Sequence, residues 1–193
     1  LEIITRKEMN VTAYATVQDA IQTLTFSGGA IQGEDFAGTG NFNRGTAISL
    51  RGLGAGATLV LVNGRRQPQA GIDADFVDVS NIPWSMVEKI DVLSDGTSAL
   101  YGSDAIAGVV NVRLREHVKG AEFQARVGRA PDGAAEAMIS QLIGNRSKDG
   151  RWLLGYEYRE RSALAAVDRW YAADSDKTRL GGRNFSSFRS NPG

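Results

Sequence analysis

The chain has 193 residues, of which 42% are hydrophobic, so it can build a packed core in one or two domains. Lys plus Arg and Asp plus Glu both number 22, and this zero formal net charge gives no indication of a nucleic-acid partner. Cysteine is absent and His117 is the single histidine. These counts exclude disulfide frameworks, thiolate zinc sites and multi-histidine metal sites, and a catalytic triad would have to use His117.

The N-terminal segment predicts a strand followed by a helix. Residues 3–5 (Ile-Ile-Thr) are typical of a strand, and Thr16 is a candidate helix N-cap with Asp19 three residues later. The apolar residues that follow recur at the spacing of one helical face. They are Val17, Ala20, Ile21 and Leu24.

A glycine-rich loop and two apolar runs come next. The loop extends over residues 27–44, and loops of this length in compact domains are usually functional or mobile. Residues 47–52 and 58–64 are predicted strands, and the second run is apolar throughout, as in a strand covered on both faces. Between them, residues 52–57 imitate a dinucleotide-binding fingerprint. That motif requires a helix after it, whereas a strand is predicted here, so we expect a simple turn and no cofactor.

The stretch from Pro83 to residue 114 alternates short helical turns and strands. Pro83 suits the first position of a helix, and residues 89–93 and 109–114 are predicted strands. Two helical turns are expected between those strands, with Asp95 and Asp104 as their caps. The mixed order of elements indicates a small α+β domain.

From Gly120 onward the sequence alternates with a period of two. Three strands are expected near residues 120–127, 135–144 and 152–159, joined by turns at residues 131–133 and 147–150. Together they predict a three-stranded antiparallel meander. One face of it carries apolar and aromatic side chains: Ala121, Phe123, Ala125, Val127, Trp152, Leu154, Tyr156 and Tyr158. These aromatic residues would suit the interfacial girdle of a membrane barrel, although such alternation is also typical of half-buried sheets in soluble proteins.

Three stretches together resemble the plug domain of TonB-dependent outer-membrane receptors. They are residues 49–52 (Ser-Leu-Arg-Gly), 59–66 (Leu-Val-Leu-Val-Asn-Gly-Arg-Arg) and 99–111 (Ala-Leu-Tyr-Gly-Ser-Asp-Ala-Ile-Ala-Gly-Val-Val-Asn). The resemblance covers most of residues 1–162. It implies an α+β plug domain over residues 1–117, and residues 118–193 would be the first three strands of a transmembrane β-barrel and the start of an extracellular loop.

The resemblance also implies a function. A plug gates a barrel in the outer membrane of a Gram-negative bacterium, and the receptor imports a scarce solute such as a siderophore, cobalamin or a glycan. The protein would not be an enzyme and would need no cofactor. Its partners would be TonB, the solute and outer-membrane lipid. The TonB-contacting segment would precede Leu1 and most barrel strands would follow Gly193, so we expect this chain to be a fragment.

The resemblance further implies a set of site residues. Arg51 would pair with carboxylates on the barrel wall, for which Glu122 and Glu157 have suitable chemistry. Two outward loops would touch the ligand through aromatic, amide and acidic side chains, and no metal site is expected among them because their acidic residues lack the spacing of a calcium loop. These ligand residues are Phe36, Asn41, Phe42, Asn43, Gln67, Gln69, Asp73, Asp75 and Phe76.

Two other functions are compatible with the sequence. The chain could be a soluble, plug-like ligand-binding or signalling module without a barrel. It could also be an enzyme that holds a nucleotide at the glycine-rich turn of residues 52–57, which the following strand disfavours. Repeated alternating strands in the full reading frame would favour the transporter, and measured nucleotide affinity would favour the enzyme.

Overall fold

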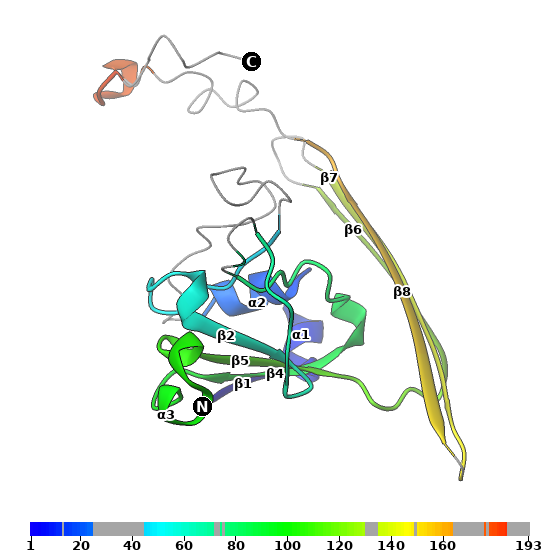
Figure 1. The fold of residues 1–193 in the computed structure, drawn as a ribbon. Helices are drawn as coiled ribbons and strands as arrows, with labels where there is room; N and C mark the ends of the chain where they lie inside the picture. The colour runs from blue at the N-terminus through cyan, green and yellow to red at the C-terminus, as the bar shows by residue number, and fades with distance from the viewer. Residues whose placement is uncertain are drawn as a thin grey trace. The chain divides into compact units, whose positions relative to one another are not determined.

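A computed structural model describes residues 1–12, 14–24, 45–71, 74, 76–129, 135–148, 150–163, 176 and 178–184. They form a five-stranded sheet with short helices and a separate three-stranded sheet (Figure 1). By their contacts, residues 1–122 with 141–156 make one compact unit, and residues 123–140 with 157–193 make another. Because this division cuts across the three-stranded sheet, a domain boundary at residue 117 stays a prediction.

The five-stranded sheet has the order β1-β4-β5-β2-β3. Strands β2 and β5 run parallel, and the other neighbouring strands run antiparallel. The strands are β1 (Glu2–Thr5), β2 (Thr58–Val62), β3 (Arg65–Arg66), β4 (Val87–Leu93) and β5 (Gly108–Leu114). The helices and 3-10 turns are α1 (Arg6–Val11), α2 (Val17–Gln22), η1 (Ala55–Ala57), η2 (Trp84–Met86), α3 (Ser98–Tyr101), η3 (Ser103–Ala105) and η5 (Thr178–Leu180).

The starts of α1 and α2 are fixed by local side-chain caps. At α1, the Thr5 hydroxyl accepts from the Glu8 N–H while the Glu8 carboxylate accepts from the Thr5 N–H, which is a complete capping box. At α2, the Thr16 hydroxyl accepts from the Asp19 N–H at 3.1 Å, as the sequence predicts. The predicted apolar face is confirmed as well, because Val17, Ala20 and Ile21 of α2 are buried, and Leu24, two residues after the helix ends, is also buried.

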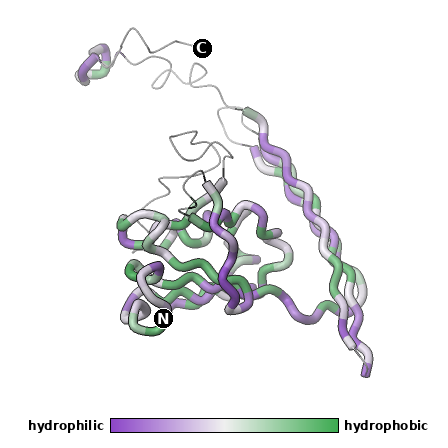
Figure 2. The backbone as a smooth tube through the Cα atoms, viewed as in Figure 1, coloured by the Kyte–Doolittle hydropathy of each residue, from purple (hydrophilic) through white to green (hydrophobic). Residues whose placement is uncertain are grey.

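The hydrophobic core lies on the strands β4, β5 and β2. Ile90, Val92, Val110 and Val112 are fully buried and pack with the apolar face of α2. Figure 2 shows these central strands as strongly apolar. Three of the strands predicted from apolar runs, near residues 58–64, 89–93 and 109–114, are therefore present in the structure.

The predicted strand over residues 47–52 is wrong. In these residues only Leu50 forms a β-bridge, although Ile48 and Leu50 are buried. The backbone around this segment is held by side chains instead of a ladder: the Leu50 N–H donates to the Thr58 hydroxyl, and the Thr46 N–H donates to the Asp78 carboxylate. Buried residues outside a strand ladder can carry the same apolar pattern as a strand, so the pattern alone predicts a strand here.

The predicted caps at Asp95 and Asp104 are also wrong. The helix α3 begins after Thr97 and has no side-chain cap. Asp95 accepts a hydrogen bond from the adjacent Gly96 N–H, and Asp104 pairs with Arg66, 38 residues away. Pro83 directly precedes the 3-10 turn η2, one position before the place we predicted.

The second sheet is the predicted antiparallel meander, with the order β6-β7-β8. Its strands are β6 (Gly120–Arg129), β7 (Ala135–Arg146) and β8 (Arg151–Arg161). One face is apolar and exposed, and includes Phe123, Val127, Trp152, Leu154, Tyr156 and Tyr158. Within the described residues, no helix is long and apolar enough to cross a membrane.

Candidate functional site

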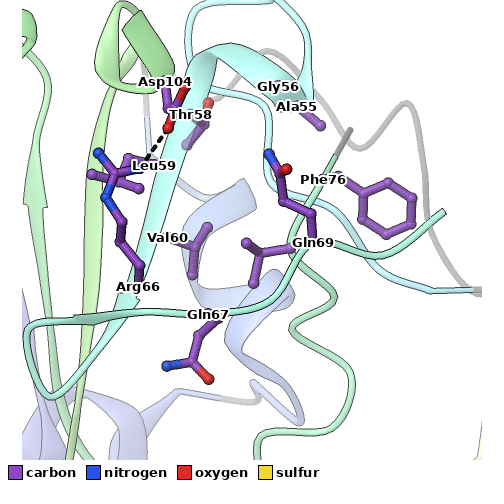
Figure 3. Close-up of a pocket in the computed structure, with 11 residues that line it drawn as sticks. Ala55, Gly56, Thr58, Leu59, Val60, Arg66, Gln67, Gln69, Phe76 and Asp104 are labelled. Carbon is purple, nitrogen blue, oxygen red and sulfur yellow. Dashed lines mark hydrogen bonds and ion pairs between the residues drawn. The ribbon is translucent and has the colours of Figure 1, made fainter. Parts of the chain in front are cut away.

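A cavity of about 290 Å³ opens on the five-stranded sheet beside β2 (Figure 3). Its apolar wall comes from β2 and from the segment that returns after β3. Its polar groups come from β2, from residues 66–69 and from η3. The lining residues are Ala55, Gly56, Thr58, Leu59, Val60, Arg66, Gln67, Gln69, Phe76, Val77 and Asp104.

A tight turn positions the polar side of this cavity. Asn63 and Gly64 adopt positive φ angles of 52° and 76°, a conformation that Asn and Gly tolerate best. The turn is tied to β5 because the Asn111 side-chain oxygen accepts from the Gly64 N–H and the Asn63 side-chain oxygen accepts from the Leu114 N–H. These bonds fix where β3 begins, and therefore where Arg66 lies.

An ion pair closes one side of the cavity. The Arg66 guanidinium donates to the Asp104 carboxylate and to the Tyr101 backbone carbonyl. The hydrogen bond from Arg66 holds the pKa of Asp104 below its ordinary value of 3.8, so this carboxylate is ionised at neutral pH. Both side chains are about half exposed, and the pair therefore orders the rim more than it stabilises the fold.

The two glutamines of the cavity differ in what they contact. The Gln67 amide donates to the Arg65 carbonyl at 3.1 Å, and in Figure 3 it turns away from the other lining side chains. The Gln69 amide extends toward the turn at Ala55 and Gly56, and it forms no hydrogen bond with any described residue. Gln69 therefore presents both a donor and an acceptor to the cavity.

Three of the predicted ligand residues line this one cavity. Gln67, Gln69 and Phe76 come together because an antiparallel β-bridge between Ala70 and Phe76 brings Phe76 back beside the residues that follow β3. The Phe76 ring is buried and forms part of the wall. The other predicted ligand residues, Phe36, Asn41, Phe42, Asn43, Asp73 and Asp75, lie outside the described residues.

The sequence reasoning missed Thr58, Arg66 and Asp104 as lining residues. Arg66 is the second residue after the Asn63-Gly64 turn, and that turn signal could have placed it in the returning strand of a hairpin. Nothing local relates Asp104 to Arg66, because they are brought together by the pairing of β2 with β5. Among the described residues, no group of three His, Cys, Asp or Glu side chains could hold a metal ion.

Arg51 lies outside the cavity, at a turn where its φ is +57°. Its guanidinium is 40% exposed and 4.0 Å from the Asp95 carboxylate. The expected contact of Arg51 with a barrel wall stays a prediction, because the structure describes only three strands after the five-stranded sheet.

The two proposed partners of Arg51 lie on β6 and β8. Glu122 accepts two hydrogen bonds from Arg115, at 2.7 and 2.8 Å. The Arg115 side chain is only 14% exposed, and this bidentate pair ties β6 to the end of β5. Glu157 is half-buried on β8, and its pairing with Arg51 also stays a prediction.

Comparison with known proteins decides the family. The model of the protein family described as "TonB-dependent Receptor Plug Domain" matches residues 1–109, which is more than half of the chain. The chain belongs to this family. The match covers the five-stranded sheet up to the start of β5 and includes every residue that lines the cavity.

Solved structures of TonB-dependent receptors share the fold. The siderophore receptor PirA from Acinetobacter baumannii is 17% identical with a TM-score of 0.66, and the match covers 90% of this chain and 26% of PirA. A mutant ferric enterobactin receptor, PfeA, from Pseudomonas aeruginosa in complex with enterobactin is 19% identical with a TM-score of 0.62, covering 86% of this chain and 25% of PfeA. The unliganded ferric citrate transporter FecA is 18% identical with a TM-score of 0.62, and the match covers 83% of this chain and 25% of FecA.

This plug-domain chain spans about a quarter of the length of the receptors it matches. At these identities the likeness shows the fold: a mixed plug sheet followed by an antiparallel meander. The predicted α+β class and the predicted resemblance to TonB-dependent receptors are both confirmed.

Proposed function

We propose that this chain is the plug, over residues 1–117, and the first three barrel strands, over residues 118–193, of a TonB-energised outer-membrane importer. The observation that carries the proposal is the succession of a plug-family domain and a sheet with one exposed apolar face. The receptor binds a scarce solute such as a siderophore, cobalamin or a glycan, and it is a transporter and not an enzyme.

The three-stranded sheet supports the proposed membrane location. Strands β6, β7 and β8 contain 10, 12 and 11 residues, and a tilted transmembrane strand needs about 9–11. Phe123 and Val127 are 72% and 84% exposed, and exposed apolar side chains of this size would be stable against lipid. The lipid of a Gram-negative outer membrane is therefore a proposed partner.

The plug supplies the proposed gate and part of the ligand site. The cavity beside β2 contains Gln67, Gln69 and Phe76, which supports a ligand contact on this face. TonB would act on the plug and displace it. Arg51 would hold the plug to the barrel through a carboxylate of the wall, such as Glu122 or Glu157.

Expression of the complete reading frame in a Gram-negative host tests this proposal. We expect the protein in the outer-membrane fraction, and we expect uptake of at least one of four labelled probes: ferric enterobactin, ferric citrate, cyanocobalamin and maltose. Uptake should stop in an otherwise identical host that lacks TonB. Recovery of the protein as a soluble periplasmic species would instead support a plug-like binding or signalling module without a barrel.

A further inference from the structure

We propose that the cavity beside β2 recognises an uncharged, hydroxyl-rich ligand of the size of a mono- or disaccharide. This proposal rests on the importer proposed above and gives the chemical class of its solute. At about 290 Å³ the cavity is at the small end of ligand pockets, which span roughly 300–1,000 Å³. It therefore takes a small molecule or one ring of a longer chain.

The charges of the cavity argue against an ionic ligand. Of the 11 lining residues that the structure describes, only Arg66 and Asp104 are charged, and they neutralise each other through the hydrogen bond described above. The Tyr101 carbonyl accepts a second hydrogen bond from the same guanidinium. An anionic chelate would lose hydration on entry and would meet the Asp104 carboxylate beside Arg66, so its entry would cost free energy.

The polar groups of the cavity match hydroxyl groups instead. A hydroxyl both donates and accepts, so it is best satisfied where a donor and an acceptor stand together. The Gln69 amide supplies such a pair and has no partner among the described residues. The Arg66 and Asp104 pair supplies another, because a guanidinium has five N–H groups and the hydrogen bonds to Asp104 and Tyr101 use two of them.

The apolar wall completes the match. Val60 and Phe76 are buried and line the cavity, whereas the Leu59 side chain lies on the opposite face of β2 and packs in a separate cluster. A sugar ring has hydroxyls at its edge and C–H groups on its faces, so it can place its edge against Gln69 and a face against this wall. A fully polar ion would leave the wall without a favourable contact.

The test measures calorimetric binding of maltose, sucrose and lactose to the whole chain in detergent micelles, with ferric citrate and ferric enterobactin as anionic probes. At least one disaccharide should bind saturably and neither chelate should bind. Gln69→Leu keeps the approximate side-chain volume and removes the amide. It should weaken that binding about tenfold, which corresponds to about 1.4 kcal/mol. Gln22→Leu, on the exposed end of α2 and outside the cavity, is the matched control and should bind as the wild type does.

Three results would overturn the proposal: no disaccharide binds, the affinity of the bound sugar is the same in Gln69→Leu as in Gln22→Leu, or a chelate binds and Gln69→Leu weakens it. The last result would leave the proposed importer intact and change only the class of its solute. Failure of the importer itself would appear separately, as a soluble protein or as uptake that does not need TonB.

Discussion

Replacement of Gly108 by alanine should strongly destabilise the plug sheet. Gly108 begins β5 and pairs with Thr58 of β2, so it lies where the parallel pair starts. Its φ is +143°, a conformation that L-residues rarely adopt. An added Cβ would lie 2.5 Å from the Leu93 backbone oxygen and 2.8 Å from Leu50 Cδ1. The backbone oxygen cannot move without disturbing the pairing of β4 with β5.

Two terms set the expected magnitude. Holding alanine at a strained φ costs about 1–3 kcal/mol. Forcing an extra carbon into a packed site costs typically about 1–3 kcal/mol more. Gly108→Ala should therefore lower the free energy of unfolding by about 2–6 kcal/mol, a large part of the roughly 5–15 kcal/mol that stabilises an ordinary domain.

Urea-dependent hydrogen exchange of the whole chain in detergent, read on peptides from β2 and β5, measures this loss. Gly64→Ala is the matched control, because Gly64 also has a positive φ, of +76°, but an added Cβ there would meet nothing within 4 Å. The control should lose only about 1–2 kcal/mol. If the two variants lose the same free energy, the close approach to Leu93 does not matter and the reasoning fails.

Three further outcomes are expected. Ile90 is fully buried in β4, so Ile90→Ala should lower the free energy of unfolding by about 2–5 kcal/mol and Ile90→Val by about 0.5–1.5 kcal/mol. Urea titrations measure both losses. Equal losses in the two variants would contradict a tightly packed core. Thr16→Ala removes the hydroxyl that caps the Asp19 N–H, so it should lower the free energy of unfolding by about 1 kcal/mol and speed hydrogen exchange in α2. Thr16→Asn keeps a capping oxygen and should leave the stability and the exchange rate as in the wild type. Identical behaviour of the two variants would argue against the cap. Arg66 lowers the pKa of Asp104, so the stability that this pair contributes should be complete above the unfolded pKa near 3.8 and lost as the pH falls through the lower folded pKa. An NMR titration of Arg66→Met should show a higher pKa for Asp104 than in the wild type. An unchanged pKa of Asp104 would refute the assigned cause.

Local signals in the sequence were sufficient for α2 and for the central strands. The cap at Thr16 and the apolar face from Val17 to Leu24 involve residues within two helical turns of each other. The apolar run of β2 likewise needs no distant partner to be recognised as a buried strand. Such features depend on backbone geometry that repeats over a few residues, so the sequence alone contains them.

The facing of β7 is an intermediate case. Apolar residues at 138, 139, 142 and 143 lie on both sides of the strand, so the sequence pattern could not choose the buried face. In the structure Met138, Ser140 and Leu142 are buried and Ile139 is 45% exposed. Burial therefore alternates regularly along β7, but only the folding of the rest of the chain determines which face of the strand is covered.

Sequence by itself determined the helix α2, the central strands β2, β4 and β5, and the antiparallel meander. Only the tertiary structure decided that Asp104 pairs with Arg66 and that residues 47–52 form no strand. The physical reason is the same in both cases. A short-range interaction acts between residues that are neighbours in every conformation, whereas a long-range contact exists only after the register of β2 against β5 has been set.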